Sequence, residues 1–123
     1  MASHPSAPAS EQTRAVVERF NEAFGRHDVD SVMRLMTEDC IFENTFPAPD
    51  GERFAGHEAV RGFWERFFRS SPRARFETEE LFAAGDRAVV RWRFDWGDGH
   101  VRGVDVFRVR DGRVAEKLSY VKG

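Results

Sequence analysis

The sequence predicts an α+β fold, in which three helices from the N-terminal half cover one face of a cone-shaped, strongly curved antiparallel or mixed sheet. Apolar residues recur at helical spacing in three segments that end before Pro72, and they then alternate with polar residues at strand spacing from Arg73 onward. A third observation is size, because 123 residues with 41% hydrophobic and 33% charged side chains suit one soluble globular domain.

Each of the three helices has its own start and stop signals. The first is expected over 11–26, with a glycine near its end. The second begins at the cap Asp28, continues through Met36 and is closed by residues 37–39. The third follows Gly56 and ends before Pro72, with a broad apolar stripe made of Val60, Phe63, Trp64, Phe67 and Phe68.

The strands that follow are expected to form a meander. A short strand is expected over 40–45, followed by a loop from Phe46 to Gly56. Four longer strands are expected over 73–82, 88–96, 101–110 and 113–122, with tight turns at Gly97-Asp98-Gly99 and Asp111-Gly112. In the first of these four, one face is expected to carry Ala74, Phe76, Thr78, Glu80 and Phe82.

Residues 1–10 are small and polar, with two prolines, and are expected to form a disordered tail before a single domain at 11–123. They contain no apolar core of a signal peptide, so a cytoplasmic protein is expected. Lys and Arg total 19 against 21 acidic residues, and the arginines are scattered. Neither nucleic acid nor a membrane is therefore expected as a partner.

Asp105 is the residue that most suggests function. It lies on the apolar face of its strand, with Val101, Gly103, Phe107 and Val109, and a carboxylate there is costly unless it is paired or protonated. A neighbouring lysine would keep it ionised, as a base or an anchor, whereas an apolar pocket with Asn44 and two aromatic rings would raise its pKa and make it an acid. A buried structural ion pair is an equally good interpretation.

Lys117 is a candidate partner only if one of two faces of the last strand points inward. One face carries Ala115, Lys117, Ser119 and Val121, and the other carries Val114, Glu116, Leu118 and Tyr120. The second face is at least as apolar, so the pattern leaves both open.

Three helices cannot fully cover a long, bent sheet, and the remaining concavity is the expected ligand site. Its polar candidates are Asn44, Asp105 and Lys117. Its apolar candidates are Phe20, Phe42, Phe63, Trp64, Phe76, Trp92, Phe94 and Phe107, and for each of them plain core packing is the alternative.

The histidines and Cys40 have no metal-ligand spacing, so no metal site is expected. No glycine motif for a cofactor is present, and Gly97-Asp98-Gly99 precedes a strand, so no cofactor is expected. His57 is expected to flank the third helix, and His100 to lie near the start of a strand.

The order of elements, with Phe42-Glu43-Asn44, Gly56-His57-Glu58-Ala59-Val60, and Asp105-Val106-Phe107-Arg108-Val109 before Asp111-Gly112-Arg113-Val114, resembles the nuclear transport factor 2-like superfamily. The resemblance covers residues 11–123. The superfamily includes ketosteroid isomerases, SnoaL-like polyketide cyclases and limonene epoxide hydrolases, so it implies the fold more strongly than one activity.

The resemblance carries over to a ketosteroid isomerase site only in part. Asp105 falls where that family keeps a protonated Asp, which is a well-known example of a carboxylic acid held neutral at pH 7. Asn44 falls at the general base and Phe20 at the oxyanion-hole Tyr, and neither can do that chemistry. The epoxide hydrolase set would need an Asp near Ser119. The resemblance is therefore nearest to SnoaL-like proteins, which are described as using a pocket acid and no cofactor.

Two functions are expected. The first is a dimeric protein that binds a small, largely apolar, carbonyl-bearing molecule and isomerises or cyclises it, with Asp105 as acid or polarising donor, Asn44 orienting the oxygen and Lys117 as a third polar group. The second is a non-catalytic carrier or partner-binding homodimer. It would pair through the outward sheet face that carries Arg91, Arg93, Arg102, Val104, Val106 and Arg108.

Overall fold

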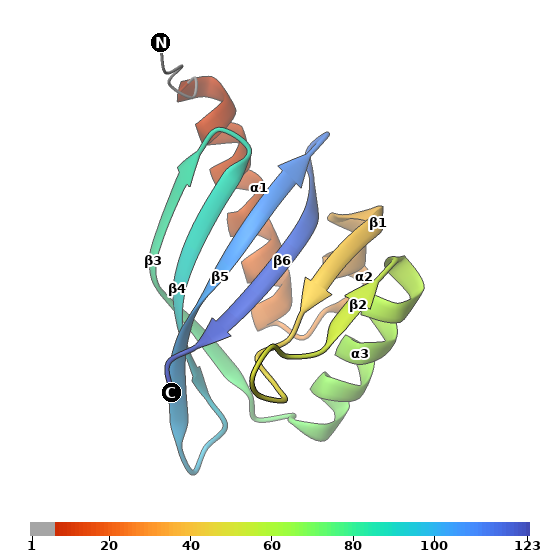
Figure 1. Ribbon diagram of the computed structural model, residues 1–123, viewed down its shortest axis with the longest axis vertical. Helices are drawn as coiled ribbons and strands as arrows, with labels where there is room; N and C mark the ends of the chain where they lie inside the picture. The colour runs from red at the N-terminus through yellow and green to blue at the C-terminus, as the bar shows by residue number, and fades with distance from the viewer. Residues whose placement is uncertain (1–6) are drawn as a thin grey trace.

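The computed structural model describes residues 7–123 and contains three helices and six strands (Figure 1). The helices are α1 (Ala7–Gly25), α2 (Val29–Arg34) and α3 (His57–Ser70). The strands are β1 (Met36–Glu43), β2 (Arg53–Ala55), β3 (Arg75–Ala84), β4 (Arg87–Asp95), β5 (His100–Arg110) and β6 (Arg113–Val121).

The six strands form one open, mixed sheet in the order β2-β1-β6-β5-β4-β3. Only the β1–β6 pair is parallel, and the other pairs are antiparallel. The long strands β3 to β6 curve strongly, and the helices lie on the inner side of that curve, with α1 behind the sheet and α3 beside β1 and β2 (Figure 1). The predicted α+β cone is confirmed.

Helix α1 begins at Ala7, four residues before the predicted start at Glu11. Its first turns are fixed to the β3–β4 turn, because Thr13 Oγ1 donates to Gly85 O at 2.6 Å and Gly85 N donates to Ser10 Oγ at 2.9 Å. Residues 7–10 of the predicted tail are therefore helical, and residues 1–6 lie outside the described residues.

The chain between α2 and β1 differs from the prediction. Asp28 caps α2 as expected, accepting from Ser31 N at 3.1 Å, but the helix ends at Arg34 and Met36 already pairs with Val114 of β6. Residues 37–39 are therefore strand and do not close a helix. Pairing with a distant strand has overridden the local helical pattern here.

The loop expected over 46–56 contains β2, which pairs antiparallel with β1 through Arg53 to Ala55. A strand of three residues between glycines is too short to show an alternation pattern. Figure 1 shows β2 as the edge of the sheet next to α3.

Two β-bulges change which side chains face inward. In β3, Thr78 pairs with Trp92 but Glu80 pairs with Arg91, so Glu79 is the extra residue. Phe76 and Thr78 therefore share a face, as expected, whereas Phe82 is 51% exposed on the opposite face and Leu81 packs inward. In β6 the extra residue is Ala115, and Val114 and Ala115 are both buried.

One part of the space between the helices and the sheet, around Phe20 and Phe107, is filled by closely packed side chains. Its centre is a ring cluster in which Phe20 meets Phe24, Trp64 and Phe107 with centroids 5.6 to 6.0 Å apart. Phe20 and Phe107 have no exposed surface.

Within residues 7–123, no helix is long and apolar enough to span a bilayer.

Candidate functional site

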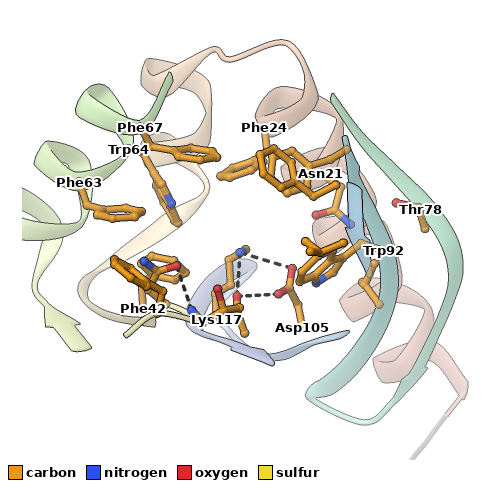
Figure 2. A pocket seen from close by; sticks show the side chains of 18 of the residues that line it. Asn21, Phe24, Phe42, Phe63, Trp64, Phe67, Thr78, Trp92, Asp105 and Lys117 are labelled. Carbon is orange, nitrogen blue, oxygen red and sulfur yellow. Dashed lines mark hydrogen bonds and ion pairs between the residues drawn. The ribbon is translucent and has the colours of Figure 1, made fainter. Parts of the chain in front are cut away.

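Next to the filled core, the inner face of the sheet lines a cavity of about 430 Å³, which is within the usual size of a small-molecule site (Figure 2). One wall is aromatic and comes from α1 and α3, with Phe24, Phe63, Trp64 and Phe67. The opposite wall comes from the sheet, and the chain after β1 lies at the mouth. Figure 2 shows Asp105 and Lys117 pointing toward each other at the inner end.

Asp105, Lys117 and Ser119 form a hydrogen-bonded group at that inner end. Ser119 Oγ donates to Asp105 Oδ1 at 2.6 Å, and Lys117 Nζ donates to Ser119 Oγ at 3.2 Å. Lys117 Nζ also lies 3.4 Å from Asp105 Oδ2. The side chains of Asp105 and Lys117 are 9% and 8% exposed, so this is a buried ion pair.

Strand register explains why these three residues lie together. Asp105 pairs with Ser119. Lys117 lies two residues before Ser119 on β6, opposite Phe107 on β5 and Phe42 on β1. Side chains two residues apart on β6 share a face, so Lys117 and Ser119 both point inward toward Asp105. The Ala115 bulge lets Val114 and Lys117 both be buried, which settles the choice between the two faces of the last strand.

Aromatic rings surround the Lys117 ammonium on its other sides. Its Nζ lies 4.9 Å from the ring centre of Phe42, 5.2 Å from Phe24 and 5.9 Å from Trp64. Such contacts stabilise a positive charge at this atom. The inner end of the cavity therefore holds a cation supported by both a carboxylate and π faces.

Most of the predicted site residues line the cavity. Asn44, Asp105 and Lys117 do so, together with Phe42, Phe63, Trp64, Phe76, Trp92 and Phe94. Phe20 and Phe107 do not, because they are wholly buried beneath it, and for these two the alternative of plain core packing was the right one.

Asn44 lies just past the end of β1, and one of its two side-chain polar atoms already has a hydrogen-bond partner. Its Oδ1 accepts from Thr45 N at 2.9 Å, which leaves the amide NH₂ as the group that Asn44 can offer to a ligand. Asn44 is therefore a donor in this arrangement.

Several lining residues were not predicted from the sequence, and the polar ones among them are Asn21, Thr45, Arg66, Ser70, Thr78 and Ser119. Asn21 is three residues before Phe24 and Arg66 is three residues after Phe63, so helical spacing places each at the flank of an apolar stripe. Polar residues at the edge of such a stripe were the available signal. Arg66 is exposed at the mouth.

Gly103 allows the indole of Trp92 to form the sheet-side wall. A Cβ at Gly103 would lie 2.5 Å from Trp92 Cζ2 and 2.2 Å from Tyr120 O, so no other residue fits without movement. The buried Trp92 Nε1 has no hydrogen-bond partner in the described part of the chain. A buried donor without a partner costs about 1–3 kcal/mol.

The histidines and acidic residues do not gather into a metal site within residues 7–123. His57 begins α3, as expected, and its Nε2 lies 2.8 Å from Met33 O, which ties α3 to α2. His100 is exposed at the first residue of β5. Neither histidine lines the cavity.

Residues 17–117 match the sequence model of the SnoaL-like domain. A protein of unknown function from Mesorhizobium loti, described as nuclear transport factor 2-like, is 47% identical, with a TM-score of 0.86 over all of both chains. A candidate ketosteroid isomerase from Kribbella flavida is 25% identical, with a TM-score of 0.79 over 93% of this chain and 80% of its own.

A candidate polyketide cyclase from Sinorhizobium meliloti is 22% identical, with a TM-score of 0.74 over 85% of this chain and 93% of its own, which is a likeness of fold alone. Among curated proteins, no sequence matches. The family match spans most of the chain and agrees with the cone of helices and sheet described above. The chain therefore belongs to the SnoaL-like domain family, within the nuclear transport factor 2-like superfamily.

Proposed function

We propose that the cavity binds a small, largely apolar molecule that carries a carbonyl group, and that the site isomerises or cyclises it without a cofactor. The observation that carries this proposal is the arrangement of the cavity, which has aromatic walls and a single polar group, Asp105-Lys117-Ser119, at its inner end. Aromatic walls favour an apolar ligand body, and the inner polar group fixes its orientation.

In this proposal Asp105 is a general base. The sequence left the ionised and the protonated form of Asp105 as alternatives, and the contact with Lys117 supports the ionised form. A carboxylate accepts a proton, whereas a carboxylic acid would donate one. Asp105 takes the proton from the carbon next to the carbonyl, and the bonding electrons move onto the carbonyl oxygen. The oxyanion that forms is stabilised by the Lys117 ammonium and the Asn44 NH₂.

The same intermediate leads to either product. If Asp105 returns the proton to a different carbon, the double bond moves and the substrate is isomerised. If the carbanion attacks a second carbonyl of the same molecule, a ring closes. The similarity in fold to a candidate ketosteroid isomerase and a candidate polyketide cyclase supports this reaction class.

The test begins with occupancy of the cavity. N-phenyl-1-naphthylamine is a neutral probe that becomes fluorescent in apolar sites, and we expect it to bind the wild type. Asp105→Asn should then lower the affinity for carbonyl compounds, or the turnover found in a metabolite screen, while probe binding persists. If both affinity and turnover are unchanged in Asp105→Asn, the assignment of the site is wrong.

A second candidate function is a homodimer that binds a ligand or partner without catalysis. The observation that favours it is the outer face of the sheet, which no helix of residues 7–123 covers (Figure 1). The half-buried Val104, Val106 and Leu118 lie on that face beside the exposed Tyr120. Arginines on the same face pair with acidic neighbours, as in Arg91–Glu80, Arg102–Glu79 and Arg108–Asp86. This mixed apolar and charged face suits a two-fold contact with a second copy.

Sedimentation tests the homodimer directly. We expect a dimer at tens of micromolar and a monomer for Val106→Glu, because a charge would be buried at the contact. Arg69→Glu, which also introduces a glutamate but at an exposed position on α3, is the control and should stay dimeric. A monomeric wild type would exclude this interface.

A further inference from the structure

We propose that Lys117 forms a covalent imine with the carbonyl ligand, so that the site works by amine catalysis. The inference rests on the proposed function, since it requires a carbonyl compound in the cavity. It goes further, because it replaces the contact between the Lys117 ammonium and the carbonyl oxygen with a covalent bond between Lys117 Nζ and the carbonyl carbon.

Position 117 holds a lysine in a chain that otherwise uses arginine almost throughout. The sequence holds two lysines, Lys117 and Lys122, among nineteen Lys and Arg residues. Arginine serves at every surface ion pair of the described residues, and lysine serves only in the buried pair with Asp105. A guanidinium is always charged and is not a nucleophile, whereas an amine can give up its proton and attack a carbonyl carbon.

The side chain of Lys117 reaches the cavity and is shielded from solvent. Lys117 is one of the residues that line the cavity, yet it is only 8% exposed, so its amine meets a bound molecule with little competing water. Desolvation in an apolar pocket is one way in which a lysine is activated to form a Schiff base with a carbonyl substrate. Lys122 lies beyond the end of β6, is exposed, and does not line the cavity.

The neighbours of Lys117 supply the proton transfers, and the step balances. Asp105 Oδ2, at 3.4 Å, takes a proton from the ammonium, and the amine attacks the carbonyl carbon. A second amine proton moves to the oxygen, giving a neutral carbinolamine. Asp105 then returns its proton to the hydroxyl, which leaves as water while the nitrogen electron pair forms the C=N bond. The product is a protonated imine, and Asp105 is again a carboxylate.

The surroundings of the amine fit this product as well as they fit the ammonium. Both species carry one positive charge on the same nitrogen, so the contacts with Asp105, Phe42 and Phe24 are kept. The protonated imine withdraws electrons from the neighbouring carbon more strongly than the carbonyl does. Asp105 can then remove the proton from that carbon, which is the same step that the proposed function requires.

Reductive trapping tests the imine. The wild type is incubated with 6-methoxy-2-naphthaldehyde and sodium cyanoborohydride, and the adduct is located by peptide mass mapping. We expect an added mass equal to the aldehyde less one oxygen atom on Lys117, at a rate at least about tenfold above that on Lys122, because the cavity concentrates and orients the aldehyde. An excess of N-phenyl-1-naphthylamine should suppress labelling of Lys117 and leave Lys122 unchanged.

Two variants keep the outcome clear. Lys122→Arg should label as the wild type does, and Lys117→Arg should lose the cavity adduct. If Lys117→Arg does not fold, Lys117→Met replaces it. Labelling of Lys117 that is no faster than that of Lys122, or that the neutral probe does not suppress, would overturn the imine. If the probe binds and Lys117 is not labelled, the proposed ligand site stands and the imine alone is excluded. If neither occurs, both are excluded.

Discussion

The space between the helices and the sheet has a filled half and an open half, and the two are built from the same kinds of residue. In the filled half, Phe20 and Phe107 are wholly buried against each other. In the open half, Phe94, Phe63 and Phe67 are only partly covered and line the cavity. Asp105 and Lys117 lie where the two halves meet. An aromatic residue is thus core or ligand wall according to its depth in the cone, and the polar pair marks the boundary.

Removing an aromatic ring should affect stability in the filled half far more than in the open half, and this is the largest difference that we expect between them. Phe20→Ala should lower the free energy of unfolding by about 3–5 kcal/mol, because it leaves a void in a close-packed cluster. Phe94→Ala should cost about 1 kcal/mol, because the ring is already partly exposed, yet it should weaken binding of N-phenyl-1-naphthylamine. Urea denaturation and a fluorescence titration measure the two effects, and equal destabilisation by both variants would contradict the division.

The boundary pair should behave as a unit. Lys117→Met or Asp105→Leu alone should cost about 3 kcal/mol in urea denaturation, since each leaves a buried charge without its partner, and the double variant should recover most of that loss. Arg102→Ala, which breaks a pair on the outer face, should cost less than about 1 kcal/mol. Additive losses in the double variant would show that the two charges are not coupled.

A smaller loss of stability is expected at Gly103, which leaves room for the Trp92 ring on the sheet side of the open half. Gly103→Ala should lower the free energy of unfolding by about 2 kcal/mol, because the new methyl group forces Trp92 and the backbone of β6 to shift. Near-ultraviolet circular dichroism should report the altered setting of Trp92. Gly112→Ala is the contrasting variant, because there the strain comes from a backbone φ of 74° and no atom lies in the way of the methyl group. An unchanged tryptophan spectrum in Gly103→Ala would mean that the ring does not rest on this glycine.

The smallest effect concerns Cys40 in the filled half. Burial raises the pKa of its thiol to about 11 from an ordinary value of 9.0. The folded state therefore favours the neutral thiol, and this contribution to stability is complete below pH 9 and is lost as the pH rises toward 11. We expect Cys40→Ala to have a flatter stability profile than the wild type across this range in denaturation experiments. Parallel profiles would contradict the assignment.

The sequence predicts the halves of this cone unequally. Alternation on β5 placed Asp105 and Phe107 on the inner face correctly, because that stretch of the strand pairs in regular register. It misassigned Phe82 and left the face of Lys117 open, because single extra residues at Glu79 and Ala115 shift the pattern and carry no mark in the sequence. Phe20 is more deeply buried than Phe94 because of how α1 and α3 lie on the sheet. The spacing of apolar residues within one element does not encode that arrangement.

In the proposed reaction, Asp105 removes a proton next to a carbonyl held in the open half. Proton NMR of 2-tetralone in D₂O measures this directly, as the loss of the signal of the protons between the ring and the carbonyl. We predict that the wild type accelerates this exchange above the buffer rate and that Asp105→Asn lowers the acceleration by about 100-fold or more. Exchange at the buffer rate with the wild type, or equal acceleration by Asp105→Asn, would contradict the claim.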